Sequence, residues 1–148
     1  MLALIQRVAQ ASVTIDQQTV GEINHGLLVF VCAQPNDTAE TADKCLQKIL
    51  ALRIFEDNQG RMNKNVQQVD GGLLIVSQFT LAADTRRGNR PGFSQAAPPQ
   101  LAEDLYDYLV RTAQARHTNV ASGRFAADMQ VHLINDGPVT IPLEITGK

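Results

Sequence analysis

The sequence predicts a single α+β domain, in which two helices pack on a curled, largely antiparallel β-sheet that forms a partial barrel. Three observations predict it: a long β-rich opening segment with short turns, two segments with helical spacing of apolar residues, and no linker within the 148 residues. Short turns require antiparallel neighbours, because a parallel pair of strands needs a long crossover connection. We therefore expect one domain over residues 1–148 and not a doubly wound parallel sheet.

The first third of the chain carries the β signals. Residues 2–15 are rich in Leu, Ile and Val, and a turn at 16–18 leads to a short strand at 19–23. A second turn at 24–26 precedes the continuous apolar run 27–32. A run without polar alternation indicates a strand that is buried on both faces.

Two segments show the 3–4 residue spacing of an α-helix. The first is expected at 38–53, with Asp37 and Glu40 placed as a capping box at its start. The second opens at Pro98-Pro99, because proline is favoured in the first turn, and it ends near Arg116.

The second half of the chain completes the sheet. A buried strand is expected at 73–77, and the Arg- and Gly-rich segment 83–98 is expected to be a loop. Two last strands are expected at 129–134 and 139–145, on either side of a turn at 135–138.

Charge and composition exclude several classes of protein. The 13 basic and 15 acidic residues give a net charge of −2 and a pI of about 5.9. Domains that coat nucleic acid by charge alone usually have a pI above about 9, so we expect no DNA partner of that kind. No apolar run approaches the ~18 residues of a membrane span, and the first residues do not resemble a secretory signal. Two cysteines without a disulfide framework favour the cytoplasm.

The sequence gives no support for a cofactor or a metal. It contains neither a glycine-rich dinucleotide fingerprint nor a P-loop. His25, His117 and His132 lie far apart in the sequence, without cysteine or carboxylate at ligand spacing. We therefore expect no metal and no cofactor.

The segment Ser77-Gln78-Phe79-Thr80-Leu81 is the first candidate for chemistry. It places two hydroxyls three residues apart where a buried strand ends, and backbone N–H groups at a strand end lack ladder partners. Such N–H groups can stabilise an oxyanion. The alternative is that Ser77 and Thr80 only satisfy hydrogen bonds of a turn.

The segment Asn135-Asp136-Gly137-Pro138-Val139-Thr140 has two interpretations. It can be a tight hairpin turn between two strands, which a Gly-Pro pair favours. The other interpretation is a cis Gly137-Pro138 bond whose two carbonyl groups grip an ammonium group.

Three arginines lie on the glycine-containing loop: Arg86, Arg87 and Arg90. Their guanidinium groups are suited to phosphates. The alternative is a solvated loop whose charges have no specific partner.

These motifs together resemble one family. The sequence resembles the D-aminoacyl-tRNA deacylases of the common bacterial and eukaryotic type, from Met1 to about Glu144. The resemblance is carried by four segments in order: the opening Met-Leu-Ala-Leu-Ile-Gln-Arg-Val, Ser77-Gln-Phe-Thr-Leu81, Arg90-Pro-Gly-Phe93 and Asn135-Asp-Gly-Pro-Val-Thr140.

The resemblance implies a homodimeric cytoplasmic proofreading enzyme without metal. It would hydrolyse the ester between a D-amino acid and the 3′ end of tRNA, and would also remove glycine mischarged on tRNA(Ala). The active site would lie at the dimer interface, where a cis Gly137-Pro138 pair enters the partner's pocket. The resemblance further implies adenosine contacts from Phe125 and Met129.

Physical reasoning is consistent with these roles. The N–H groups near Gln78, Phe79 and Thr80 are expected to hold the oxyanion, and the Gly137 and Pro138 carbonyls to hold the α-amino group. One enantiomer's side chain would then point to solvent, and the other's would clash with main chain. Thr80 has no base within three residues, so we expect the 2′-hydroxyl of the tRNA to help activate water while Thr80 and Ser77 position groups.

Two other functions remain open at this point. The chain can be a non-catalytic module that binds the 3′ end of tRNA. It can also be a small-metabolite hydrolase or deaminase that ignores tRNA and whose site only happens to lie at a subunit interface.

Overall fold

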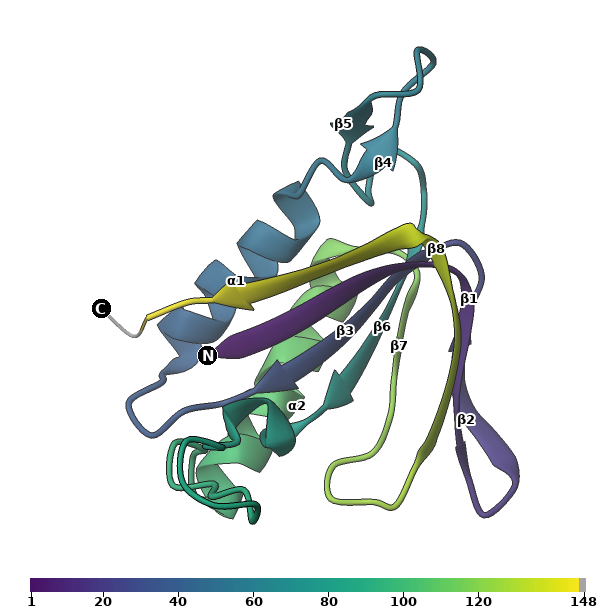
Figure 1. Cartoon of the computed structure of the whole chain (residues 1–148). Helices are drawn as coiled ribbons and strands as arrows, with labels where there is room; N and C mark the ends of the chain where they lie inside the picture. The colour runs from purple at the N-terminus through teal and green to yellow at the C-terminus, as the bar shows by residue number, and fades with distance from the viewer. Residues whose placement is uncertain (147–148) are drawn as a thin grey trace.

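The centre of the fold is a mixed β-sheet with strand order β2-β1-β3-β6-β7, to which β8 adds by pairing with β1 (Figure 1). The computed structural model describes residues 1–146 of the chain. The sheet strands are β1 (Leu2–Ile15), β2 (Gln18–Ile23), β3 (Gly26–Cys32), β6 (Gly72–Ser77), β7 (Val120–Ser122) and β8 (Gln130–Glu144). The other elements are α1 (Ala39–Ala51), β4 (Phe55–Glu56), β5 (Met62–Lys64), the 3-10 turn η1 (Phe79–Ala82) and α2 (Pro99–Arg116).

The predicted α+β class with a partial barrel and two packed helices is confirmed. β1 pairs antiparallel with β2, β3 and β8, whereas β3–β6 and β6–β7 are parallel, so the sheet is mixed. The sheet curls until its two ends nearly meet. At Gly21 of β2 an added Cβ would lie 2.6 Å from the carbonyl oxygen of Ser122 in β7, so only glycine permits this approach.

The core has two parts because alternate side chains of a strand point to opposite faces. On β3, Leu27, Val29 and Val31 pack toward the layer of α1 and α2, while Leu28 lies in the smaller cluster inside the barrel. β6 divides its side chains between the same two clusters. The prediction that the run 27–32 is buried on both faces is therefore confirmed.

The first helix starts as predicted within a residue, but its cap differs. Thr38 is the N-cap, and it exchanges the two hydrogen bonds of a capping box with Thr41. The expected box of Asp37 with Glu40 is wrong, because the Asp37 carboxylate is occupied elsewhere.

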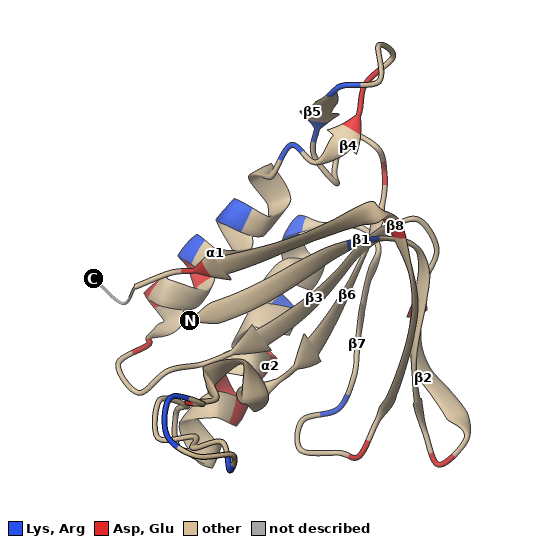
Figure 2. Cartoon of the chain, in the orientation of Figure 1, with Lys and Arg blue, Asp and Glu red and all other residues tan. Residues whose placement is uncertain are grey.

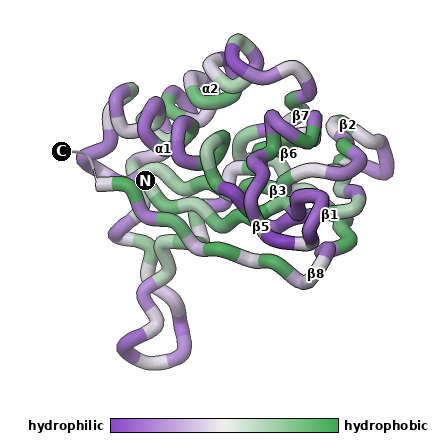
Figure 3. The backbone as a smooth tube through the Cα atoms, turned by 90° about the horizontal axis from the view of Figure 1, so that it is seen from above, coloured by the Kyte–Doolittle hydropathy of each residue, from purple (hydrophilic) through white to green (hydrophobic). Residues whose placement is uncertain are grey.

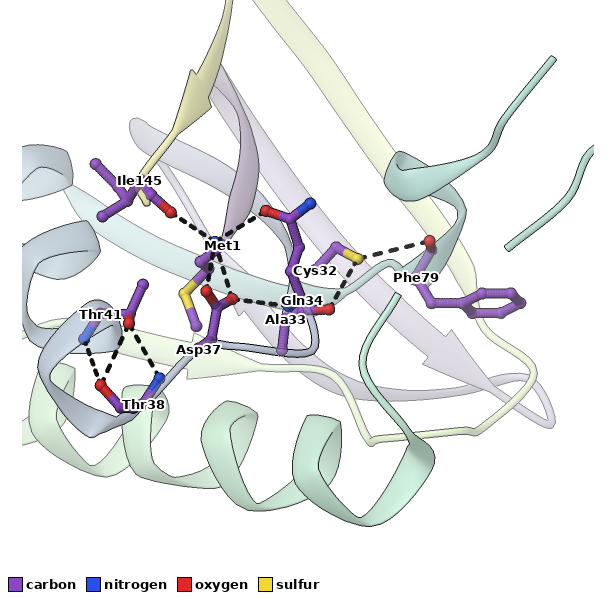
Figure 4. Close-up of polar contacts among 9 residues, drawn as sticks. All are labelled: Met1, Cys32, Ala33, Gln34, Asp37, Thr38, Thr41, Phe79 and Ile145. Carbon is purple, nitrogen blue, oxygen red and sulfur yellow. Dashed lines mark hydrogen bonds and ion pairs between the residues drawn. The ribbon is translucent and has the colours of Figure 1, made fainter. Parts of the chain in front are cut away.

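Asp37 forms a buried ion pair with the N-terminal ammonium of Met1 (Figure 4). The N–O distance is 2.8 Å and the two side chains are 2% and 4% exposed. The ammonium also donates to Gln34 Oε1 at 3.2 Å and to the Ile145 carbonyl at 2.7 Å. These contacts fix the loop between β3 and α1 against the paired ends of β1 and β8.

We expect Asp37→Ala to lower the free energy of unfolding by about 3–5 kcal/mol, because it leaves a buried ammonium without its counter-ion. The melting temperature should fall by roughly 10 °C. Glu40→Ala removes the exposed pair with Lys44 and should cost only about 0.3–0.5 kcal/mol. Equal losses for the two variants in denaturant unfolding would show that the Met1–Asp37 pair contributes no special stability.

The end of the chain departs from the prediction of two strands joined by a hairpin. β8 is one strand that keeps its direction, and both of its halves pair with β1. The register shifts between Gln6 and Val8 and between Val8 and Gln10, so the segment 136–139 bulges out of a continuous ladder. The short strands β4, β5 and β7 were also missed, since two or three residues carry too little periodicity.

Two segments extend from the body of the molecule. The β4–β5 hairpin stands above the helices in Figure 1, and the loop 83–98 stands away from the sheet and carries a cluster of basic residues (Figures 2 and 3). Among residues 1–146, no helix is long and apolar enough to cross a membrane. In the same residues, no three His, Cys, Asp or Glu side chains are grouped so as to hold a metal ion.

Candidate functional site

The segment that follows β6 turns sharply into η1 and leaves backbone N–H groups free. The N–H of Gln78 donates to the Val31 carbonyl at 2.8 Å, so it is not available to a ligand. The next two N–H groups, of Phe79 and Thr80, open η1 and have no acceptor among the described residues. Of the three N–H groups expected to bind an oxyanion, that of Gln78 is therefore excluded, and those of Phe79 and Thr80 remain.

The Thr80 hydroxyl has a donor, not a base, as its neighbour. Gln78 Nε2 donates to Thr80 Oγ1 at 2.5 Å, and this is the partner that the described residues offer it. A group that donates a hydrogen bond cannot remove the hydroxyl proton. Ser77 is half-buried at the end of β6.

A cavity of about 650 Å³ opens at the carboxyl ends of β3 and β6. Ser77, Gln78 and Phe79 line one side of it, and Phe125 and Met129 line another. The structure thus brings these predicted residues together, although about 45 residues separate them in the sequence. Thr80 lies beside the cavity and is not part of its lining.

Cys32 is a residue of this site that the sequence reasoning missed. Its buried thiol donates to the Phe79 carbonyl at 3.6 Å and to the Ala33 carbonyl at 3.4 Å (Figure 4). In a trans peptide the C=O and the following N–H point in opposite directions, so the Thr80 N–H points away from the thiol. Burial raises the pKa of Cys32, which keeps the thiol protonated and able to donate. The sequence did not reveal this contact because it depends on the parallel pairing of β3 and β6. That pairing places the ends of both strands at one edge of the sheet.

Tyr106, a buried residue of α2, was also missed. Its hydroxyl donates to the Ile75 carbonyl at 2.7 Å, and its ring lies 6.2 Å from that of Phe125. Burial raises the pKa of Tyr106 to about 12, so the hydroxyl stays a donor. It ties the wall of the cavity to β6.

The three arginines of the loop 83–98 have unequal environments. Arg86 donates to both carboxylate oxygens of Asp84, at 2.9 and 2.8 Å, and holds the pKa of that carboxyl well below its usual range. Arg87 and Arg90 are exposed and form no ion pair with the described residues. Asp84 also bridges to Gly92, which closes the loop at its base.

Gly137 and Pro138 are joined by a cis peptide bond, as the resemblance implies. The buried Arg7 holds this turn: its Nε donates to the Asp136 carbonyl at 3.1 Å and its Nη1 to the Ile54 carbonyl at 2.8 Å. Arg7 is a further residue that sequence reasoning missed.

The turn lies far from the cavity within one chain. Neither Gly137 nor Pro138 lines the cavity. Arg7 pairs with Leu27 at the start of β3, whereas Ser77 pairs with Val31 near its end. The separation along the strand is roughly 13 Å for four residues. One chain therefore does not bring the Gly-Pro turn to the segment 77–80.

The family model of D-Tyr-tRNA(Tyr) deacylase matches residues 4–144. D-aminoacyl-tRNA deacylases of Delftia acidovorans and Cellvibrio japonicus are each 61% identical and align with 98% of this chain and with 96% and 99% of their own lengths.

Solved structures give the same fold. A structure described as a c-Myc DNA unwinding element binding protein is 38% identical, with a TM-score of 0.94 over 99% of both chains. A probable eukaryotic D-amino acid tRNA deacylase is 17% identical, with a TM-score of 0.84 over 97% of this chain and 98% of its own, and supports the fold alone.

Proposed function

The chain belongs to the D-Tyr-tRNA(Tyr) deacylase family, and from this we infer how it hydrolyses the ester between a D-amino acid and the 3′-terminal adenosine of tRNA. Like its relatives it is a hydrolase. Water adds to the ester carbonyl, the tetrahedral oxyanion collapses, and the 3′-hydroxyl of tRNA leaves with a proton while the D-amino acid is released. The observation that carries the proposal is the cavity at the ends of β3 and β6, which is lined both by Phe79, the first residue of η1, and by an aromatic wall.

The oxyanion is stabilised by the N–H groups of Phe79 and Thr80. The removal of one such donor typically costs about 10²–10³-fold in rate, so two donors supply a large part of what an activated ester needs. Cys32 supports this role because it fixes the orientation of the peptide between Phe79 and Thr80. Phe125 and Met129 contact the terminal adenosine from the opposite wall.

A second copy of the chain completes the site. Within one chain the cavity is remote from the Gly137-Pro138 turn, which Arg7 holds firmly in place. Leu133 and Ile134, in the same strand β8, are 36% and 52% exposed and give the homodimer an apolar contact. The partner's Gly-Pro turn then enters the cavity.

The carbonyl groups of Gly137 and Pro138 form the chiral filter. They hold the α-amino group while the N–H groups hold the carbonyl, so the side chain of a D-amino acid points to solvent and that of an L-amino acid meets main chain. Glycine has no side chain and passes, which extends the activity to glycine mischarged on tRNA(Ala). The enzyme thereby proofreads aminoacyl-tRNA in the cytoplasm.

Thr80 positions groups and is not the nucleophile. We expect Thr80→Ala to lower kcat by about 2- to 10-fold, the worth of one hydrogen bond, because the backbone donors remain. Single-turnover rates with saturating enzyme measure this step. Complete loss of turnover, with tRNA binding and the circular dichroism spectrum unchanged, would instead assign the nucleophile to Thr80.

Release of labelled D-Tyr and L-Tyr from tRNA by the purified protein tests the function. We expect turnover of D-Tyr-tRNA and none of L-Tyr-tRNA above the uncatalysed rate. A module that only binds the 3′ end of tRNA would bind D-Tyr-tRNA without turnover. A small-metabolite hydrolase would ignore tRNA, and substitutions of Arg86, Arg87 and Arg90 would then be silent.

A further inference from the structure

An exposed pair of aromatic rings lies at the rim of the cavity. Phe79 and Phe93 meet edge to face, with ring centroids 5.0 Å apart, yet they remain 55% and 38% exposed. Phe79 contributes its carbonyl to the Cys32 contact on one side and projects its ring to the other side (Figure 4). Neither ring is needed by the core, since both lie outside its two clusters.

The pair belongs to the same cavity as the adenosine wall but lies on a different part of it. Phe93, Phe79, Phe125 and Tyr106 all line the cavity. Phe125 packs near Tyr106, whereas Phe79 packs on Phe93 of the extended loop 83–98. The cavity therefore offers two separate aromatic surfaces, and the terminal adenosine occupies only one of them.

Unpaired positive charge lies on the loop that carries Phe93. Arg86 is held by Asp84, but Arg87 and Arg90 form no ion pair within residues 1–146. The bridge between Asp84 and Gly92 joins the two sides of the loop one residue before Phe93, so Arg87 and Arg90 lie within the loop that this bridge closes beside Phe93. This local charge contrasts with the net charge of −2 of the whole chain.

We propose that the Phe79–Phe93 pair, with Arg87 and Arg90, is a subsite for the nucleotide that precedes the terminal adenosine of tRNA. Single-stranded nucleic acid is bound by stacking of bases on aromatic rings and by cationic groups along the phosphates. The subsite presents both. The proposal rests on the proposed function, and it adds a binding determinant outside the chiral centre.

The experiment compares two substrates: D-Tyr-tRNA and D-Tyr esterified to adenosine alone. Only the first has a nucleotide for the subsite. We expect Phe93→Ala to lower kcat/KM on D-Tyr-tRNA about 5- to 150-fold more than on the adenosine ester, mainly through KM, since this is the range for one base–aromatic stack. Phe93→Trp should keep the wild-type kcat/KM on D-Tyr-tRNA relative to the adenosine ester, because tryptophan can also stack on a base. Phe93→Leu should lose it as Phe93→Ala does.

Matched controls come from the β4–β5 hairpin. Met62 is 54% exposed and lies outside the cavity, so Met62→Ala should leave both substrates unaffected. Arg87→Ala and Arg90→Ala should raise KM for D-Tyr-tRNA and weaken its dependence on salt, whereas Arg61→Ala on the hairpin should do neither.

Several results would overturn the subsite. The first is an equal loss of kcat/KM on both substrates in Phe93→Ala, and the second is full activity of Phe93→Leu on D-Tyr-tRNA. The third is a changed oligomeric mass of Phe93→Ala in light scattering, which would show that the rings contact a second copy of the chain. If Phe93→Ala lost activity on D-Tyr esters but not on D-Ala esters, the two rings would instead contact the side chain of the amino acid. If wild-type protein released D-Tyr from neither substrate, the proposed function itself would fail.

Discussion

A D-Tyr-tRNA whose terminal adenosine lacks the 2′-hydroxyl is expected to be deacylated about 10²–10⁴-fold more slowly than the normal substrate, the range for one general acid–base group. The reason is that the described residues place no base beside the Thr80 hydroxyl. The Thr80 hydroxyl accepts from Gln78 Nε2, and in the described residues the cavity lining holds one titratable carboxylate, Asp128, and no histidine or lysine. We therefore propose that the substrate supplies the hydroxyl that orients and activates water.

The measurement is single-turnover release of D-Tyr from tRNA that ends in 2′-deoxyadenosine, with the ester on the 3′-oxygen. Competition with uncharged tRNA shows whether binding is retained. Full activity on the deoxy substrate would contradict substrate assistance. Asp128 would then be the candidate for the general base that activates water. A loss accompanied by an equal loss of binding would likewise contradict a role in the chemical step.

Gly137→Ala is expected to lower kcat/KM on D-Tyr-tRNA by about 10²-fold or more, because a shift of about 1 Å in a positioning group has that effect. Gly137 has a φ of +134°, a conformation that L-residues rarely adopt. An added Cβ would lie 2.8 Å from Val139 Cγ2 and 3.0 Å from Arg7 Nη2. The substitution is therefore strained, and we expect the turn and its two carbonyl groups to shift.

Gly60→Ala is the matched control for this substitution. Gly60 also has a positive φ, +77°, but its added Cβ would meet nothing within 4 Å. It should cost about 1–2 kcal/mol of stability and leave deacylation unchanged. If Gly137→Ala kept full activity and full discrimination against L-Tyr-tRNA, the turn would not be the chiral filter.

The fold was predictable wherever a segment is long and strongly patterned. The run 27–32, the strand at 73–77 and both helices carry periodicity over many residues, and all lie close to their predicted bounds. Of the two interpretations of the turn at 135–138, the hairpin is wrong; the sequence could not exclude it because a Gly-Pro pair can occur in a hairpin and in a bulge. Only the pairing of both halves of β8 with β1 distinguishes them.

The candidate site was predictable in its parts but not in its assembly. Ser77–Thr80 stood out as hydroxyls at a strand end, and Phe125 and Met129 entered through resemblance. Cys32 and Arg7 could not be identified, since a single cysteine in a buried strand and a single arginine in the opening strand have no local signature. Their roles arise from contacts across 47 and 129 residues of sequence.

The N–H groups of Phe79 and Thr80 and the carbonyl groups of Gly137 and Pro138 are main-chain atoms, and this has a consequence for mutation. A substitution cannot delete a peptide N–H or a carbonyl group, except where proline replaces the donor. Loss of the proposed stereospecificity would therefore proceed through residues that position the backbone, Cys32 at the Phe79 carbonyl and Arg7 at the Asp136 carbonyl, and not through the main-chain groups proposed to contact the substrate.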